Sequence, residues 1–233
     1  MQFRPNRFEV LPIIVKNLLI INALVFLAQT TLSKQLPISL EDTFALHTWQ
    51  SQLFQPWQLI THMFMHGDFW HLAFNMLALW MLGSTLETLW GPKRFLTFYI
   101  ICGLGAAFCH LTVLYIESEH LIKMFQSLPY SDQEYNRAAV NSILNQATLG
   151  ASGAVFGCAV AFAYLFPNTI FLISFIFPLK AKWAIPGYII LELVSAVRNS
   201  AGDNIAHVAH LGGALVGFLL VYFWNKNNKK TFY

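Results

Sequence analysis

The sequence predicts an all-α, polytopic membrane protein with six transmembrane helices. Of its 233 residues, 56% are hydrophobic and 11% are charged, and the mean hydropathy is +0.52. A soluble domain carries roughly 25% charged residues and needs them to cover its surface. A transmembrane helix needs about 20 mostly apolar residues, and six segments of this chain qualify or nearly qualify. They are residues 11–29, 69–89, 95–116, 150–166, 183–197 and 205–224, which we assign to a single membrane domain over residues 1–233.

Local signals support the ends of these segments. The first segment follows Arg4 and Arg7, as in a signal peptide, but no small-x-small cleavage site clearly follows it, so we keep it as a span. Pro92 follows the second segment and Pro167 follows the fourth, and proline commonly stands just beyond a helix end. The fifth segment is short unless it begins nearer Phe177.

Two long loops join the spans on the outer side. Residues 30–68 carry Trp49 and Trp57, and tryptophan favours the lipid interface, so we expect this loop to lie there. Residues 117–148 are polar and rich in acidic side chains. They predict a solvated outer loop with room for a short helix.

The placement of Lys and Arg predicts the orientation, because cytoplasmic segments carry an excess of both residues. Ten of the 14 fall on one side of the membrane or at its edge: Arg4, Arg7, Lys16, Lys93, Arg94, Lys180, Lys182, Lys226, Lys229 and Lys230. Both termini are therefore expected in the cytoplasm. The sequence shows no obvious transit peptide or added soluble domain, which favours a bacterial inner (plasma) membrane.

Charge and cysteine content exclude other classes. A net charge of +3 without a basic–aromatic patch predicts no nucleic-acid partner. Cys102, Cys109 and Cys158 lie in apolar stretches without CxxC spacing, so we interpret them as packing residues. The lipid bilayer is the partner that the composition implies, and the oligomeric state stays open.

Three spans begin with polar side chains, which are costly in lipid and therefore candidates for function. His71 and Asn75 are four residues apart on the second span, so they share one helix face. Ser152 opens the fourth span, and His210 lies near the start of the sixth. Because these three spans all run from outside to inside, His71, Ser152 and His210 are expected at similar depth near the outer surface.

Glycine spacing predicts how two of these spans meet. Gly153 and Gly157 on the fourth span, and Gly213 and Gly217 on the sixth, form small-xxx-small patterns that let helices approach closely in lipid. The histidine of the sixth span stands three residues before Gly213, on the same stripe. If the two spans pack together, this histidine and the serine of the fourth span can reach hydrogen-bond distance.

Four short motifs, in this order and on these helices, resemble the rhomboid family of intramembrane serine proteases over nearly the whole chain. The motifs are HxxxN at residues 71–75, ExxxGxxRF at 87–95, GxSG at 150–153 and AHxxG at 209–213. The resemblance implies a six-span fold whose substrates are transmembrane segments of other proteins, cut near the outer face. It also implies a catalytic dyad of serine and histidine with no third carboxylate and no cofactor.

Site roles follow from the same resemblance. It implies Ser152 as the nucleophile and His210 as the general base, which is chemically sound because a serine hydroxyl needs an adjacent base to lose its proton. His71, Asn75 and the Ser152 backbone N–H would form the oxyanion hole. Donors of this kind are typically worth ~10²–10³ in rate.

Supporting residues and departures from the family pattern complete the prediction. Gly150 and Gly153 flank the nucleophile in its motif, and His66 is expected to order the loop or approach the oxyanion site. Phe156 stands where a tyrosine is common and can still stack on the catalytic histidine. Gln58 follows Trp57 where many bacterial members carry arginine, and the 117–148 loop is longer than in compact members.

Other interpretations are open for single residues and for the chain. A serine in an apolar helix is usually a packing residue, and His207 is either an interfacial side chain or an alternative base. His62, His66 and His71 invite a metal site, but no HExxH motif is present, so we expect no metal. The alternatives for the chain are a catalytically silent rhomboid-like protein that binds membrane clients, and a small transporter or metalloprotein.

Overall fold

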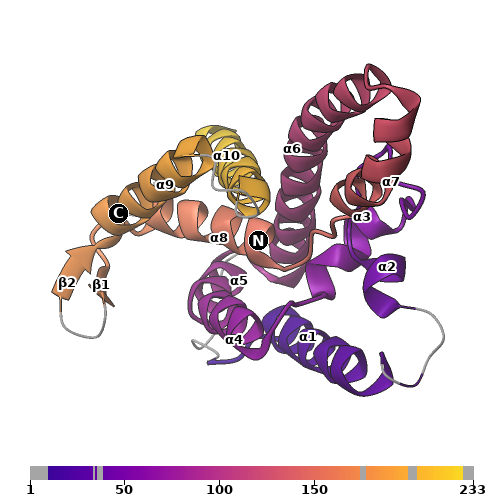
Figure 1. The fold of residues 1–233 in the computed structure, drawn as a ribbon. Coiled ribbons are helices and arrows are strands. Elements are labelled where there is room, and N and C mark those ends of the chain that lie inside the picture. The colour runs from indigo at the N-terminus through magenta and orange to yellow at the C-terminus, as the bar shows by residue number, and fades with distance from the viewer. Residues whose placement is uncertain (1–9, 34, 36–38, 174–176, 199–203, 228–233) are drawn as a thin grey trace.

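The computed structural model describes residues 10–33, 35, 39–173, 177–198 and 204–227. These residues form a helical protein with one small β-hairpin, as Figure 1 shows. The all-α membrane fold predicted from composition is confirmed, and the hairpin is an addition to it. The first half of the chain contains α1 (Ile13–Leu32), α2 (Leu40–Phe44), α3 (Gln58–Thr61), η1 (His62–Phe64), α4 (Phe69–Ala78), the π-helical η2 (Leu79–Gly83), α5 (Ser84–Trp90) and α6 (Pro92–Gln126). The second half contains α7 (Tyr130–Leu144), α8 (Ser152–Leu165), β1 (Ile170–Ile173), β2 (Phe177–Lys180), α9 (Ala181–Arg198) and α10 (Asn204–Asn227).

Helix lengths agree with four of the predicted spans. Within the described residues, four helical stretches are long and apolar enough to cross a membrane: Ile13–Leu32, Phe69–Trp90, Pro92–Gln126 and His207–Lys226. The second stretch is made of α4, η2 and α5 in sequence. The predicted fourth span is α8, an apolar helix of 14 residues, and the predicted fifth is α9, which has 18 residues. The chain is an integral membrane protein, and a total of six spans stays a prediction.

The N-terminal end of α1 is joined to the second stretch by a carboxylate. Pro12 precedes α1 and offers no side-chain cap. Glu87 of α5 supplies one instead, because its two oxygens accept hydrogen bonds from the N–H groups of Ile14 at 2.9 Å and Val15 at 2.8 Å. The first N–H groups of a helix have no partner within it, so Glu87 fixes where α1 begins.

Residues 117–148, predicted as a solvated loop with room for a short helix, are helical for most of their length. Helix α6 continues to Gln126, ten residues beyond the predicted end of its span, and α7 folds back beside it (Figure 1). None of the 15 residues of α7 is buried. Polar helix-forming residues here make a helix outside the core, because hydrophobic periodicity alone marks where a span ends but not where its helix does.

The described part of the predicted first outer loop that lies between residues 39 and 68 packs onto the protein. His47, Gln58, His62 and His66 in it are buried. Leu46 also pairs with Thr148 through two backbone hydrogen bonds of 2.8 Å. This pairing fixes the loop against the segment that leads into α8.

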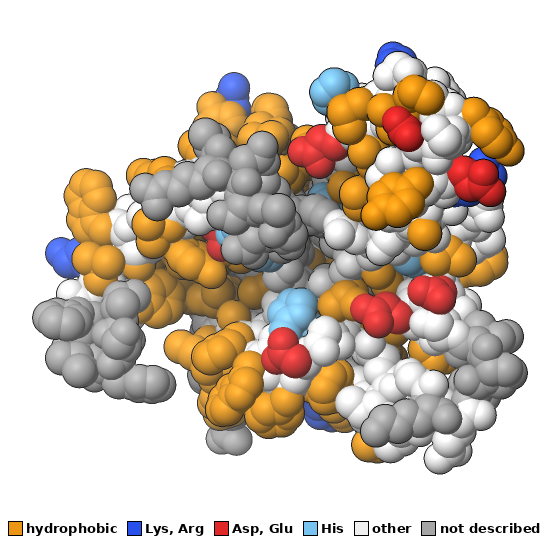
Figure 2. All heavy atoms as spheres, in the orientation of Figure 1, with side chains coloured by type: hydrophobic (Ala, Val, Ile, Leu, Met, Phe, Trp, Pro, Cys, Tyr) orange, Lys and Arg blue, Asp and Glu red, His pale blue; other side chains and the backbone are white. Residues whose placement is uncertain are grey.

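Apolar side chains cover much of the surface. Figure 2 shows hydrophobic side chains spread across this face, with acidic ones both in the region of α6 and α7 and in that of α2 and α4. Phe74 on α4, Leu24 on α1 and Leu191 on α9 are each about 60% exposed or more (65%, 59% and 62%). A soluble protein rarely exposes a contiguous apolar area of this extent, and lipid is the medium that such a surface suits.

Candidate active site

The residues before α8 make an abrupt turn that sets Ser152 at the helix start. Gly150 has φ of +129°, which favours glycine, and its N–H donates to the carbonyl of His62 at 2.9 Å. Ser152 is the first residue of α8. The N–H groups of a helix's first turn lack intrahelical acceptors, so donors are available beside the Ser152 hydroxyl.

Helices α8 and α10 touch backbone to backbone, as the glycine spacing predicts. A Cβ at Gly213 would lie 1.9 Å from the carbonyl oxygen of Gly153, and one at Gly217 would lie 2.6 Å from the Cα of Gly157. Any larger residue would separate the helices. The paired glycines therefore determine how closely the polar groups near the ends of these helices approach.

Ser152 and His210 meet at this contact. The Ser152 Oγ lies 2.8 Å from His210 Nε2, which is hydrogen-bond distance. The ring of Phe156 stacks on the imidazole of His210 at 4.4 Å between centroids and 7° between planes. Tyr188 of α9 stacks on the other side of Phe156 at 5.3 Å. The imidazole is thus held from one face by an aromatic stack.

His71 lies against the same turn. A Cβ at Gly150 would be 2.9 Å from the Cε1 and Nε2 atoms of His71, so glycine is needed for the imidazole to approach. Asp68 caps α4 by accepting from the His71 N–H at 2.9 Å. Asn75 is buried, and its amide donates to the His71 carbonyl at 2.9 Å. The structure brings His71 to the turn at Gly150, and Asn75 lies one helical turn further along α4.

His66 and His62 lie in the segment that precedes α4, and His66 contacts His71. The ring of His66 is edge-on to that of His71 at 5.1 Å, and its backbone exchanges two hydrogen bonds with the Gln29 amide at 3.0 and 3.2 Å. Burial, with the neighbouring charge of His71, lowers the pKa of His66 to about 4. Burial also lowers the pKa of His62 to about 4, although its bond to the Gln58 carbonyl opposes the shift. Both imidazoles are neutral near pH 7.

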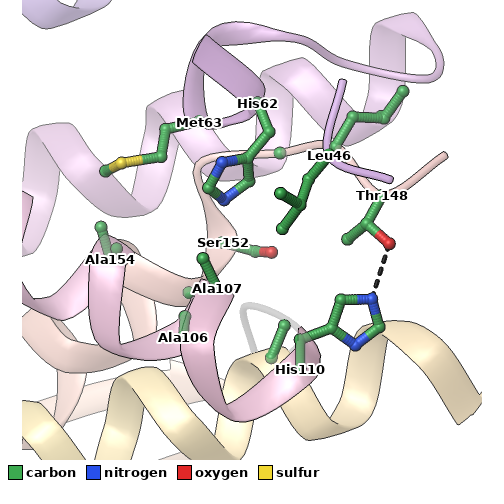
Figure 3. Close-up of a pocket in the computed structure, with 14 residues that line it drawn as sticks. Leu46, His62, Met63, Ala106, Ala107, His110, Thr148, Ser152 and Ala154 are labelled. Carbon is green, nitrogen blue, oxygen red and sulfur yellow. Dashed lines mark hydrogen bonds between the residues drawn. The ribbon is translucent and has the colours of Figure 1, made fainter. Parts of the chain in front are cut away.

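A cavity opens beside Ser152, as Figure 3 shows. The side chains of His62, His110 and Thr148 line it with those of several small residues, and the Ser152 hydroxyl points into it. His110 Nε2 lies 2.6 Å from Thr148 Oγ1. Polar groups in an otherwise apolar wall make this cavity suitable for water.

Glu192 of α9 is a functional candidate that the sequence reasoning missed. Its Oε2 atom lies 3.0 Å from His210 Nδ1 and 2.5 Å from His207 Nδ1. The resemblance implied no third carboxylate, so its presence here differs from that expectation. A visible signal was available, because Glu192 is the one acidic residue in the predicted span 183–197. His207, predicted as an interfacial side chain or an alternative base, lies with its Nδ1 beside the same Glu192 oxygen.

The same three side chains have the spacing of metal ligands. Within the described part of the chain, Glu192, His207 and His210 form a group whose ligand atoms lie within 4.8 Å of one another. The histidines considered for a metal from sequence, His62, His66 and His71, do not form such a group with described partners. In this group, the ligand atoms of both histidines are already hydrogen-bonded to the Glu192 carboxylate.

A family model described as the Rhomboid domain matches residues 53–227 of the sequence. The chain belongs to the rhomboid family. The matched region contains α3 to α10, and therefore both helices that carry the Ser152 and His210 pair. The family predicted from the four motifs is confirmed.

Curated relatives carry the same family name. The chain is 31% identical over 177 residues to "Rhomboid protein 1, mitochondrial" of Saccharomyces cerevisiae, covering 74% of this chain and 43% of the relative. It is 29% identical over 164 residues to "Rhomboid protease GluP" of Bacillus subtilis, with 70% and 25% covered. It is 28% identical over 172 residues to "Rhomboid protease AarA" of Providencia stuartii, with 70% and 54% covered.

The alignments cover only part of each relative, so the properties of the whole relatives are not assigned to this chain. The aligned part spans about half or less of the length of several of these rhomboid relatives. Their names include both mitochondrial and bacterial proteins, so the bacterial inner membrane stays a prediction. The predicted cytoplasmic termini include residues 1–9 and 228–233, which lie outside the described residues.

Proposed function

We propose that this rhomboid protein is an intramembrane serine endopeptidase that cleaves transmembrane segments of membrane proteins near the outer face. The observation that carries the proposal is the 2.8 Å contact between Ser152 Oγ and His210 Nε2, made between two membrane helices. Three relatives with protease in their names, GluP, AarA and GlpG, support it.

The chemistry proceeds by acyl transfer. Ser152 Oγ attacks the scissile carbonyl while its proton passes to His210 Nε2, and the same proton then goes to the leaving amide nitrogen. Water from the cavity then attacks the acyl carbonyl and gives a proton to His210 Nε2, which passes it to Ser152 Oγ as the ester bond breaks and the new carboxylic acid leaves. Acylation and deacylation together return serine and imidazole to their starting forms.

The developing oxyanion needs donors in place before reaction. The Ser152 backbone N–H at the start of α8 is one donor, and the positive end of the α8 dipole favours negative charge there. His71 is the second donor, because its imidazole lies against Gly150. Asn75 completes the group in this proposal, after its amide leaves the His71 carbonyl for the substrate oxygen.

An active-site probe tests the proposal without knowledge of the substrate. Detergent-purified protein is treated with a fluorophosphonate, alongside Ser152→Ala and His210→Ala variants of equal thermal stability. Labelling of the parent chain that both variants lose, together with cleavage of a transmembrane peptide, is the expected result. A folded parent chain that neither labels nor cleaves would instead support the silent, client-binding alternative.

A further inference from the structure

Glu192 is a buried carboxylate on a helix whose neighbouring residues are apolar and exposed. Leu191 and Leu193, on either side of it, are 62% and 52% exposed, whereas Glu192 is 6% exposed. A carboxylate inside a membrane span is expensive and needs partners. Glu192 turns from the apolar surface of α9 to the histidines of α10, which supply those partners.

The partners fix the state of the imidazole. An ionised carboxylate only accepts hydrogen bonds, so the His210 Nδ1 atom beside Glu192 Oε2 is the one that carries a proton. The Nε2 atom of the neutral ring is then a lone-pair acceptor, and it faces the Ser152 hydroxyl. One carboxylate thus selects the tautomer that can remove the serine proton.

The side chains of Ser152, His210 and Glu192 form a continuous chain of hydrogen bonds. Ser152 Oγ is 2.8 Å from His210 Nε2, and His210 Nδ1 is 3.0 Å from Glu192 Oε2. Three separate helices supply them: α8, α10 and α9. The aromatic stack of Phe156 and Tyr188 restrains the ring face, whereas the carboxylate restrains rotation in the plane of the ring.

We infer that Glu192 is a positioning residue for the serine protease proposed above, holding His210 in its reactive tautomer and orientation. The inference rests on that proposed function. When the proton of Ser152 Oγ moves to His210 Nε2, the imidazolium that forms keeps its Nδ1–H on the Glu192 carboxylate, which offsets the new positive charge. Glu192 remains ionised throughout and exchanges no proton with substrate.

His207 has a secondary place in this arrangement. Its Nδ1 donates to the same Glu192 oxygen, from one helical turn before His210 on α10. This second hydrogen bond orients the carboxylate without contacting Ser152. The titratable groups near His210 are Glu192 of α9, His207 of α10, His71 of α4 and His110 of α6, and Tyr188 of α9 contacts Glu192 in turn.

The test substitutes Glu192→Gln, which keeps the shape of the side chain and removes its charge. The full chain is purified in detergent, and cleavage of a transmembrane peptide is measured as kcat and KM across pH. The expected result is a kcat lower by about 10²–10⁴-fold with KM unchanged, as when a carboxylate behind a catalytic histidine is replaced by an amide. The acidic limb of kcat/KM moves to lower pH, because removing a negative charge makes the imidazole harder to protonate.

Matched variants separate this role from a structural one. Glu192→Asp keeps the charge, so it recovers at least about tenfold of the lost kcat and restores the parent acidic limb; it also serves if the Gln variant fails to fold. Glu87→Gln is the control. Glu87 is buried like Glu192, but it accepts hydrogen bonds from backbone N–H groups of α1 and not from His207 or His210. The Glu87→Gln variant retains the parent kcat and pH profile.

Three outcomes overturn the inference. Glu192→Gln with parent kcat and an unmoved acidic limb would overturn it, while loss of activity in Ser152→Ala and His210→Ala would leave the protease proposal standing. A parent chain without labelling or cleavage would remove both. Loss of parent activity in a chelator, restored by zinc, would make Glu192, His207 and His210 a metal site instead.

Discussion

Two buried glutamates, one in α5 and one in α9, have very different surroundings. Glu87 is 2% exposed and accepts from two backbone N–H groups of α1. Glu192 is 6% exposed and accepts from the side chains of His207 and His210. The first carboxylate is bonded to backbone N–H groups, whereas the second is bonded to two imidazoles, one of which contacts Ser152.

The difference shows how to distinguish a structural charge from a functional one. Backbone N–H groups at a helix start need an acceptor in every state of the protein, so Glu87 stabilises one fixed arrangement. Imidazoles gain and lose protons near neutral pH, so a carboxylate beside them also selects tautomer and charge. Burial is the same in both cases, and the partner determines the role.

Separating α10 from α8 is the strongest way to break the arrangement around Glu192. Gly213→Ala places a methyl group 1.9 Å from the Gly153 carbonyl oxygen, so the backbones must move apart. Overpacking of this kind typically costs about 1–3 kcal/mol, and a misplacement of about 1 Å can cost about 100-fold in rate. Thermal unfolding and peptide cleavage in detergent measure the two effects.

Gly187→Ala is the matched control for that prediction. No atom lies within 4 Å of a Cβ at Gly187, which is also in a helix. Alanine is better than glycine in a helix interior by roughly 0.5–1 kcal/mol, so its stability stays equal or rises. Parent activity in Gly213→Ala would show that the glycine contact does not position the serine and histidine.

His62 sharpens the comparison, because it is a buried ionisable group whose hydrogen bond goes to a backbone carbonyl. Its pKa is about 4 in the fold, below the 6.5 of the unfolded chain. As pH falls below 6.5 the unfolded chain takes up the proton first, so stability is lost progressively down to about pH 4. The expected loss from this one group is up to about 3 kcal/mol.

Replacing the imidazole tests that pH dependence. His62→Asn can still donate to the Gln58 carbonyl but cannot titrate. Melting temperature is recorded between pH 7 and pH 5 for both chains, and the variant should lose less stability over this range. Equal slopes in the two chains would mean that His62 is protonated in the fold as readily as in the unfolded chain.

Glu87→Gln gives the smallest effect and tests the other side of the comparison directly. The amide can accept from one of the Ile14 and Val15 N–H groups, but its NH₂ opposes the other. We expect a loss of about 1–2 kcal/mol in the free energy of unfolding, the range of a helix cap or a charged hydrogen bond. Activity per folded molecule is unchanged, and a loss of kcat at full stability would contradict the structural role of Glu87.

Much of the fold followed from local pattern. Long apolar runs predict membrane helices because lipid offers no partners to the backbone, so hydrogen bonds must close within each span. The ends of helices were less predictable: α6 runs to Gln126 because polar residues continue a helix as readily as apolar ones. Strand β1 lay in a stretch that apolar content had not assigned to any element, and β2 begins at Phe177, the alternative start considered for the fifth span; α9 itself begins at Ala181.

The sequence by itself determined the membrane class, the glycine faces of α8 and α10, and the choice of Ser152, His71 and His210 as the polar groups to examine. These are properties of composition and spacing along single helices. Only the tertiary structure decided that Glu192 faces those histidines, because the rotation of α9 about its own axis is fixed by its packing against α8 and α10. The sequence around Glu192 does not specify its partners. The packing of α8, α9 and α10 does.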